Sequence, residues 1–224
     1  MSTNDYKGSF VSFLLSSGAL TFGDFTLKSG RQSPYMVNTG KFNTGLLISE
    51  LGSYYAAAIV DAKESGLITS LPDVIFGSAY KGIPLAVTTS IALAKDFGID
   101  VGYCFNRKEA KDHGEGGNLV GLVPTAGSNV LIVDDVMTAG TALREVVPLI
   151  ASIEGANIIG SLIAVDRKER GQGELSAVVE ASREMNFPVF SIVDAEEIAD
   201  KLSKTAPDKA EAIRAYLKKY KPAK

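Results

Sequence analysis

Short apolar runs alternate with helical patterns through the middle of the chain. The runs are rich in β-branched and aromatic residues, which predicts strands buried on both faces of a sheet. They are residues 74–77, 101–105, 130–133, 157–165 and 188–193. Residues 83–97 and 142–150 lie between such runs and place apolar side chains at helical spacing. The alternation predicts an α/β fold with a parallel-sheet core flanked by helices.

The remaining segments carry patterns that extend this picture. We predict helices at residues 6–17, 44–65 and 174–185 and from about Pro207, and strands at residues 20–27 and 119–123. The long helix at 44–65 is expected to serve the core. Because the sequence shows no internal repeat and no linker, we predict a single domain over residues 1–224.

Composition excludes several classes of function. The chain has 224 residues and a net charge of −3, so no global basic field draws it to nucleic acid or to a membrane surface. A single cysteine, Cys104, excludes an internal disulfide. No apolar run approaches the roughly 20 residues of a membrane span, and the first residues lack a signal-peptide pattern. These features predict a cytoplasmic protein.

The segment at residues 130–141 carries the clearest chemistry. A buried strand ends in two adjacent carboxylates, Asp134 and Asp135, and a small-residue turn leads into a helix. Such a turn binds anions, because unpaired amide groups and the helix dipole point at it. Carboxylates beside a phosphate fit a ligand that also presents hydroxyls, as a ribose 5-phosphate does. An acidic strand end before an ordinary capped helix is the alternative.

Four polar segments at other strand ends are further candidates, each with a simpler interpretation. The turn at residues 78–82 carries Lys81, which a solvated turn would also explain. Residues 106–118 join three cations, the only histidine and several glycines, which indicates either a functional lid or a mobile surface loop. Residues 28–35 read as a polar hairpin connection, and the mixed charges at 166–171 as a solvated run.

Five segments spread over nearly the whole chain, namely residues 25–35, 78–82, 106–118, 130–141 and 166–171, resemble motifs of a known family. Residues 130–141 closely resemble the phosphoribosyl pyrophosphate (PRPP) motif of the type I phosphoribosyltransferases, and residues 25–35 resemble a signature of the orotate phosphoribosyltransferases. The resemblance implies the type I phosphoribosyltransferase fold. It also implies a small hood, from about residues 1–40 plus about 163–173, and a catalytic lid loop at about 106–118. Tyr35-Met36 departs mildly from the Phe-Phe or Phe-Tyr that often follows the proline in that family.

The resemblance also assigns roles to individual residues. It implies orotate contacts from Lys28, Tyr35, Met36, Thr138 and Arg167. It implies PRPP contacts from Tyr80, Lys81, Arg107, Lys108, Lys111, His113, Asp134, Asp135, Val136, Met137, Thr138, Ala139, Gly140, Thr141 and Ala142. The catalytic residues would be Lys111, His113, Asp134 and Asp135, with the histidine acting on the leaving pyrophosphate. A cis peptide is expected between Ala79 and Tyr80.

The expected reaction joins orotate to the ribose 5-phosphate of PRPP, giving orotidine 5′-monophosphate and pyrophosphate in pyrimidine biosynthesis. The resemblance implies Mg²⁺ held mainly by PRPP, with Asp134 and Asp135 nearby and no direct ligation by the protein. It further implies a homodimer whose lid residues act in trans. Two alternatives remain: a phosphoribosyltransferase for another base, and a regulator that senses PRPP without catalysis. The cations Lys28 and Arg167 argue against the first, and the lid argues against the second.

Overall fold

A six-stranded sheet lies at the centre of the part of the chain that this computed structural model describes, residues 5–27, 29–109, 118–137, 140–171 and 173–222. In spatial order its strands are β5 (Leu119–Gly121), β4 (Gly102–Asn106), β3 (Val74–Gly77), β6 (Asn129–Val136), β7 (Asn157–Asp166) and β8 (Val189–Asp194). Neighbouring strands run parallel except for the edge strand β5, which is antiparallel to β4. The predicted parallel-sheet core is confirmed.

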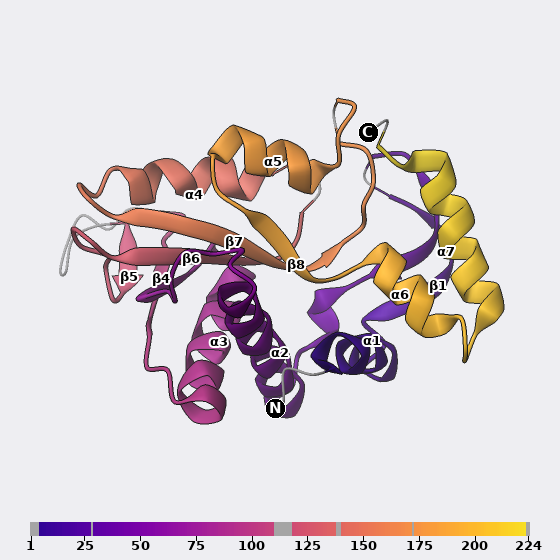
Figure 1. Ribbon diagram of the computed structural model, residues 1–224, viewed down its shortest axis with the longest axis horizontal. Helices are drawn as coiled ribbons and strands as arrows, with labels where there is room; N and C mark the ends of the chain where they lie inside the picture. Colours follow the sequence, from indigo (N-terminus) through magenta and orange to yellow (C-terminus); the bar gives the residue numbers. More distant parts are fainter. Residues whose placement is uncertain (1–4, 28, 110–117, 138–139, 172, 223–224) are drawn as a thin grey trace.

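Helices cover both faces of this sheet. Figure 1 shows α2 (Gly45–Glu64) and α3 (Gly82–Phe97) below it, and α4 (Thr141–Ala151) and α5 (Ala177–Met185) above it. Successive side chains of β6 divide between the two layers, since alternate residues of a strand point to opposite faces. Leu131 and Val133 belong to the larger apolar cluster, whereas Val130 and Ile132 belong to the smaller one. Burial on both faces explains why this strand is an unbroken apolar run.

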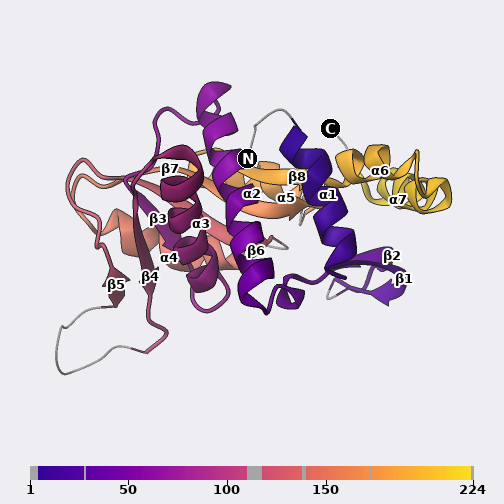
Figure 2. The ribbon, with the colours of Figure 1, turned by 90° about the horizontal axis from the view of Figure 1, so that it is seen from below.

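A second group of elements lies beside the sheet. It comprises α1 (Tyr6–Ser16), α6 (Ala195–Leu202), α7 (Pro207–Tyr220) and a two-stranded antiparallel sheet of β1 (Leu20–Thr26) and β2 (Gln32–Val37). Figure 2 shows the β1–β2 pair next to the lower end of α1 and below α7. Phe10 and Phe13 of α1 lie 5.0 Å and 5.3 Å from the ring of Tyr54 on α2, which joins this group to the main layers.

The structure differs from the sequence prediction in two places on this side of the molecule. Residues 32–35 were expected as part of a hairpin connection, but they belong to β2, which pairs with β1 through register partners such as Phe22 and Tyr35. The helix expected from residue 174 begins at Ala177, since the Ser176 side chain accepts from the backbone N–H of Val179 and caps it. A short 3₁₀ helix, η2 (Thr39–Lys41), follows β2 and was not predicted.

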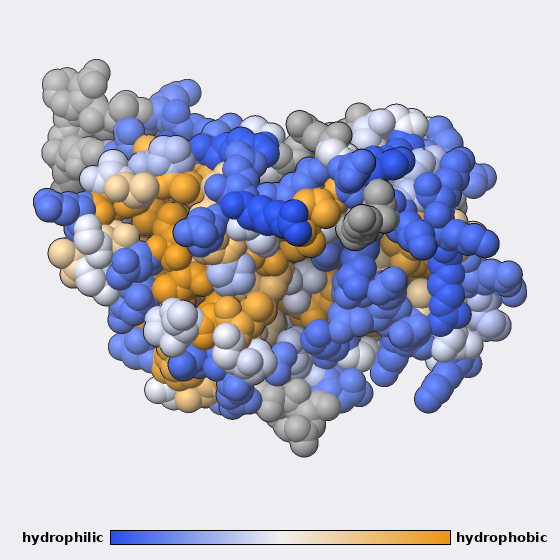
Figure 3. Space-filling view, turned by 45° about the horizontal axis from the view of Figure 1, so that its top comes forward, coloured by the Kyte–Doolittle hydropathy of each residue, from blue (hydrophilic) through white to orange (hydrophobic). Residues whose placement is uncertain are grey.

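Polarity divides the surface in the same way as the architecture. On the face that Figure 3 shows, apolar residues gather over the half that contains the sheet, whereas the half that contains α6 and α7 is mainly hydrophilic. Exposed large apolar side chains include Ile91, Tyr103, Leu122 and Val123. Among the residues described, no helix combines the length and apolar character needed to cross a membrane.

Candidate active site

The acid pair at the end of β6 is held by contacts from three other segments. Asp135 is buried, and its Oδ2 accepts from Nζ of Lys81 at 2.6 Å and from Oγ1 of Thr39 at 2.7 Å. The buried hydroxyl of Tyr55 donates to the backbone carbonyl of Asp134 at 2.7 Å. Ser78 donates to Oδ2 of the same aspartate at 3.3 Å. The two carboxylates are therefore fixed in place by α2, η2 and the β3–α3 turn.

The two aspartates have different electrostatic environments. Burial raises the pKa of Asp134 to about 6, an effect that the backbone N–H of Asp135 partly offsets by donating to it. Burial also opposes ionisation of Asp135, but hydrogen bonds from Lys81 and Thr39 outweigh it and hold that pKa below its usual value. One acid is thus firmly ionised, and its neighbour titrates close to neutral pH.

The β3–α3 turn contains the predicted cis peptide between Ala79 and Tyr80, which is confirmed. The backbone N–H of Ala79 donates to Oδ1 of the buried Asn106 at 2.9 Å, and this anchors the turn to the end of β4. Glycine is required on both sides of the turn. A Cβ on Gly77 would lie 2.0 Å from the carbonyl oxygen of Gly82, so the strand and helix could not approach this closely with side chains.

Lys81 and Tyr80 present their side chains at the surface of this turn. The Tyr80 side chain is 71% exposed, and the Lys81 side chain is 66% exposed although its ammonium group contacts Asp135. Both residues come from the position predicted for pyrophosphate binding. Their exposure leaves them accessible to a ligand above the acid pair.

The turn after β6 leads directly into α4, as predicted. Val136 ends the strand and Met137 follows it, both half-buried. Gly140 precedes the helix with a φ of 69°, a backbone conformation that suits glycine, and Thr141 and Ala142 are the first helical residues. Thr138 and Ala139 lie outside the described residues, so their predicted contacts stay predictions.

The base of the predicted lid is described, and its centre is not. The backbone N–H of Arg107 donates to the carbonyl of Asn118 at 2.7 Å, which closes the two ends of the loop. Nε of Arg107 is buried and has no hydrogen-bond acceptor in the described part of the chain. Lys108 pairs with Glu145 of α4 at 2.9 Å. The predicted catalytic residues Lys111 and His113 lie outside the described residues.

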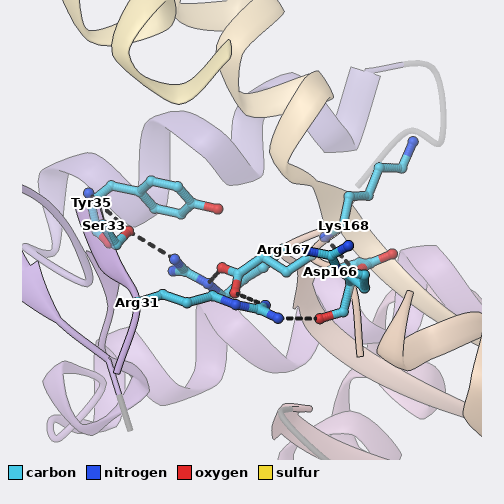
Figure 4. A network of polar contacts seen from close by, with 8 residues as sticks. Arg31, Ser33, Tyr35, Asp166, Arg167 and Lys168 are labelled. Carbon is cyan, nitrogen blue, oxygen red and sulfur yellow. Dashed lines mark hydrogen bonds and ion pairs between the residues drawn. The ribbon is translucent and has the colours of Figure 1, made fainter. Parts of the chain in front are cut away.

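Arg167, which follows β7, lies in a network of polar and aromatic contacts (Figure 4). Its Nη2 donates to Oγ of Ser33 at 2.9 Å, and its guanidinium carbon lies 4.2 Å from the centre of the Tyr35 ring. Its Nε donates to Glu169. Tyr35 is fully buried, and Met36 beside it is half-buried. The structure thus brings Tyr35 and Arg167 together, with Met36 next to Tyr35 along β2, while Lys28 and Thr138 lie outside the described residues.

The donors near the acid pair suit a metal ion held mainly by a substrate. Asp134 and Asp135 supply the carboxylates, but one oxygen of Asp135 already binds Lys81 and Thr39. The described residues contain no group of three or more side chains able to hold a metal ion. The two carboxylates fit a place beside an ion whose own ligands are phosphate and hydroxyl oxygens of a substrate.

Similarity to known proteins identifies the family. Residues 54–202 match the phosphoribosyl transferase domain family. Orotate phosphoribosyltransferase of Pseudomonas fluorescens (strain SBW25) is 52% identical over 217 residues, which cover 96% of this chain and 98% of that protein. The chain belongs to the orotate phosphoribosyltransferases. Orotate phosphoribosyltransferase of Pseudomonas putida (strain F1) is 53% identical over 218 residues.

Solved structures of orotate phosphoribosyltransferases share this architecture. The crystal structure of the Francisella tularensis enzyme superposes with a TM-score of 0.82 at 38% identity, covering 95% of this chain and 99% of that chain. Leishmania donovani UMP synthase aligns with a TM-score of 0.73 over 42% of its own chain, and at 19% identity it shows the fold alone. The predicted fold class and the family resemblance are confirmed.

Several residues around this orotate phosphoribosyltransferase site were not singled out from the sequence. They are Arg31, Thr39, Tyr55, Asn106, Glu169 and Tyr216. Each acts through contacts between segments far apart in the chain, such as the bond from Thr39 to Asp135 across 96 positions. Arg31 lies within the segment at 25–35 that resembles the family signature, and Glu169 lies within the charged run at 166–171. The sequence therefore shows both charges, but it does not show that the two side chains form an ion pair.

Proposed function

We propose that this chain transfers the ribose 5-phosphate of PRPP to orotate, giving orotidine 5′-monophosphate and pyrophosphate. One observation carries the proposal. The acid pair ends β6, and Arg167 follows the adjoining parallel strand β7, with Val136 and Val165 as register partners. Neighbouring strands lie about 4.8 Å apart. The acid pair, which would bind the ribose, and Arg167, which would bind a carboxylate, therefore follow neighbouring strands at the same end of the sheet.

The PRPP side of the site would use the residues around β6 and α4. Asp134 and Asp135 would accept hydrogen bonds from the ribose 2′- and 3′-hydroxyls. The amides at Gly140, Thr141 and Ala142, at the start of α4, would bind the 5′-phosphate together with Val136, Met137 and the turn between them. Thr138 and Ala139 are included in this proposal because of their place in the PRPP motif.

Cations on two sides would receive the pyrophosphate. Lys81 and Tyr80 are exposed on the β3–α3 turn, and the buried Nε of Arg107 offers a donor without an acceptor in the described part of the chain. Lys108, Lys111 and His113 of the lid would complete this set. Substitution at ribose C1 expels pyrophosphate through an oxocarbenium-like transition state, so a closing lid of about residues 106–118 would exclude water and supply positive charge.

The base would lie between β2 and the end of β7, under the hood. Arg167 would read the orotate carboxylate in a bidentate way that a lysine cannot reproduce. Tyr35, Met36, Thr138 and Lys28 would contact the ring or its substituents. The hood, proposed at about residues 1–40 plus about 163–173 of the single domain, gains a further side from α7, because Tyr216 lies 5.9 Å from the Tyr35 ring.

Mg²⁺ is part of this proposal as a cofactor. When bound to the phosphates, it would neutralise charge that develops on the leaving pyrophosphate. Asp134 and Asp135 are the described residues placed to hold it, through the ribose hydroxyls and without a protein cage. The protein's own part is to orient the ribose and to keep Asp135 ionised.

We also propose a homodimer in the cytoplasm, with lid residues of one subunit acting in the pocket of the other. Exposed apolar side chains on the sheet half, such as Ile91 and Tyr103, are compatible with an interface there. Nucleic acid and membrane have no part in the proposal. Transfer to another base and a purely regulatory role are less favoured, because the curated relatives at 52–53% identity are orotate phosphoribosyltransferases.

Absorbance-monitored turnover tests the proposed reaction. Purified protein, PRPP and Mg²⁺ are incubated with orotate, and loss of the orotate band is followed. Uracil, hypoxanthine and adenine serve as parallel substrates under the same conditions. We expect efficient turnover of orotate alone. Turnover of a purine with no reaction of orotate would overturn the assignment of the base, and binding of PRPP with no turnover of any base would favour a regulator.

A further inference from the structure

A single carboxylate joins the two arginines on the base side of the site. Oε2 of Glu169 accepts from Nη1 of Arg31 at 3.0 Å, and Oε1 accepts from Nε of Arg167. The three side chains are largely removed from solvent, with exposed fractions of 12% for Glu169, 13% for Arg167 and 21% for Arg31. Arg31 and Arg167 thus donate to different oxygens of this carboxylate. The cluster links the turn before β2 to the segment after β7.

The contacts fix the plane of the Arg167 guanidinium. Glu169 holds its Nε, Ser33 holds its Nη2 at 2.9 Å, and the Tyr35 ring lies 4.2 Å from its central carbon. An arginine side chain that is not held in this way loses rotamer entropy when it binds a ligand. A guanidinium that is already oriented binds a planar carboxylate without that loss.

Arg31 gives Glu169 a second anchor. Its Nη2 donates to the carbonyl of Arg170 at 2.8 Å, and its guanidinium carbon lies 5.4 Å from the Tyr220 ring. The carboxylate of Glu169 is therefore held at both oxygens and cannot follow Arg167 if that side chain moves. Two guanidiniums and one carboxylate also leave a single positive charge within this cluster, which suits a ligand with one carboxylate.

We propose that Glu169 is a positioning residue of the base site, and that by fixing Arg167 it sets selectivity for a pyrimidine that carries a carboxylate. This inference rests on the proposed function, in which Arg167 reads the orotate carboxylate. A ligand without that carboxylate makes no use of the oriented guanidinium. Its binding is consequently insensitive to Glu169.

Two substitutions separate position from charge. Glu169→Asp keeps the charge but is one methylene too short to reach both arginines, whereas Glu169→Gln keeps the length and removes the charge. Glu184→Gln is the matched control. Glu184 of α5 also pairs with an arginine, Arg144 of α4, but this pair is exposed. For each variant we measure KM for orotate and for PRPP, and the dissociation constants of orotidine 5′-monophosphate and of uridine 5′-monophosphate, which lacks the carboxylate.

We expect both Glu169 variants to raise two constants about tenfold: KM for orotate and the dissociation constant of orotidine 5′-monophosphate. This is the scale of losing a buried hydrogen bond to a charged group. KM for PRPP and the affinity for uridine 5′-monophosphate should change less than about twofold. The control variant should match the unmodified protein in all four quantities. This loss of selectivity for the carboxylate is a readout that a purely structural role would not give.

Other outcomes overturn the proposal. If Glu169→Gln tightens orotate binding while Glu169→Asp has no effect, the residue tunes charge and does not position Arg167. If both variants weaken all four ligands together and lower the melting temperature, its role is structural. Failure of the proposed function is distinct, because then the unmodified protein itself would not convert orotate. Normal orotate turnover by the unmodified protein with unchanged orotate KM in both variants would overturn the positioning role alone.

Discussion

Oγ1 of Thr39 donates a hydrogen bond to Oδ2 of Asp135 at 2.7 Å, although the two residues are 96 positions apart in the chain. Nζ of Lys81 donates to the same oxygen at 2.6 Å. One carboxylate oxygen therefore connects η2, the β3–α3 turn and the end of β6. Because PRPP would need Lys81 for its phosphates, Thr39 is the contact that can keep Asp135 oriented when the lysine moves away.

Thr39→Val should therefore raise KM for PRPP by about three- to tenfold, since valine keeps the shape of threonine and loses the hydroxyl. KM for orotate should change much less. Thr39→Ser retains the hydroxyl and is expected to behave like the unmodified protein. Steady-state kinetics with each substrate varied in turn measures both constants, and an equal rise in both would show that Thr39 supports the site only as a whole.

The pKa values of the acid pair give a second prediction. In ¹³C-labelled protein without ligand, the carboxyl carbon of Asp134 should titrate near pH 6, and that of Asp135 below the usual range. Loss of one signal in Asp134→Asn assigns the pair. PRPP affinity should weaken below about pH 6, because a protonated Asp134 can no longer accept from both ribose hydroxyls. Titration of both carboxyls near pH 4 would contradict this account.

The raised pKa also predicts how stability depends on pH. The folded-state pKa of Asp134, about 6, lies above the ordinary aspartate value of 3.8. The folded state therefore binds more protons between these pH values, and stability falls as pH rises through them. Asp134→Asn removes the buried charge and should stabilise the ligand-free protein at pH 7.5 by about 1–3 kcal/mol. At pH 4.5 the gain should largely vanish. Melting temperatures at the two pH values test this, and a gain of equal size at both would rule out the ionisation as its cause.

The sequence predicted the sheet well because its strands are buried on both faces. Residues 74–76 and 130–133 are apolar runs for this reason, and Gly77 and the acid pair follow them at the strand ends. β2 was missed because Ser33 and Pro34 are turn formers, and only pairing with β1 makes them a strand. Propensity was overridden there by a tertiary contact.

The chemistry of the site was predictable where it depends on one short segment. Asp134 with Asp135, and Lys81 within its turn, have local patterns that a sequence displays. Glu169 was interpreted as part of a solvated charged run. Its partner Arg31 is far away in the chain, and nothing in the sequence shows that Arg167, two positions before it, folds back to pair with it. The roles assigned to Lys28, Lys111, His113, Thr138 and Ala139 stay predictions, since these residues lie outside those described.

Recognition of the base gives a further prediction. Arg167→Ala should make the binding free energy of orotate less favourable by about 2–5 kcal/mol, the range for removing one partner of a desolvated charge pair. Part of that cost arises because Glu169 then keeps only Arg31 as a partner. PRPP affinity should change far less. Calorimetric titration with each substrate measures both, and equal weakening of the two would show that Arg167 does not belong to the base site.

The proposed sharing of the active site between subunits can be tested by complementation. One variant carries a defective pocket, Asp134→Asn with Asp135→Asn, and the other carries a defective lid, Lys111→Ala. Each should be nearly inactive alone. If the lid acts in trans, a mixed dimer combines the intact pocket of the second variant with the intact lid of the first.

Random exchange of subunits makes about half of the dimers mixed, each with one intact site, so about a quarter of all sites should regain activity. Native mass spectrometry of isotopically distinct subunits confirms the exchange, and turnover of orotate is then measured in the same mixture. If each lid instead closes on its own chain, every site in the mixture keeps one defect. Activity that stays at baseline after confirmed exchange would therefore exclude the trans arrangement, because no dimer would then contain a complete site.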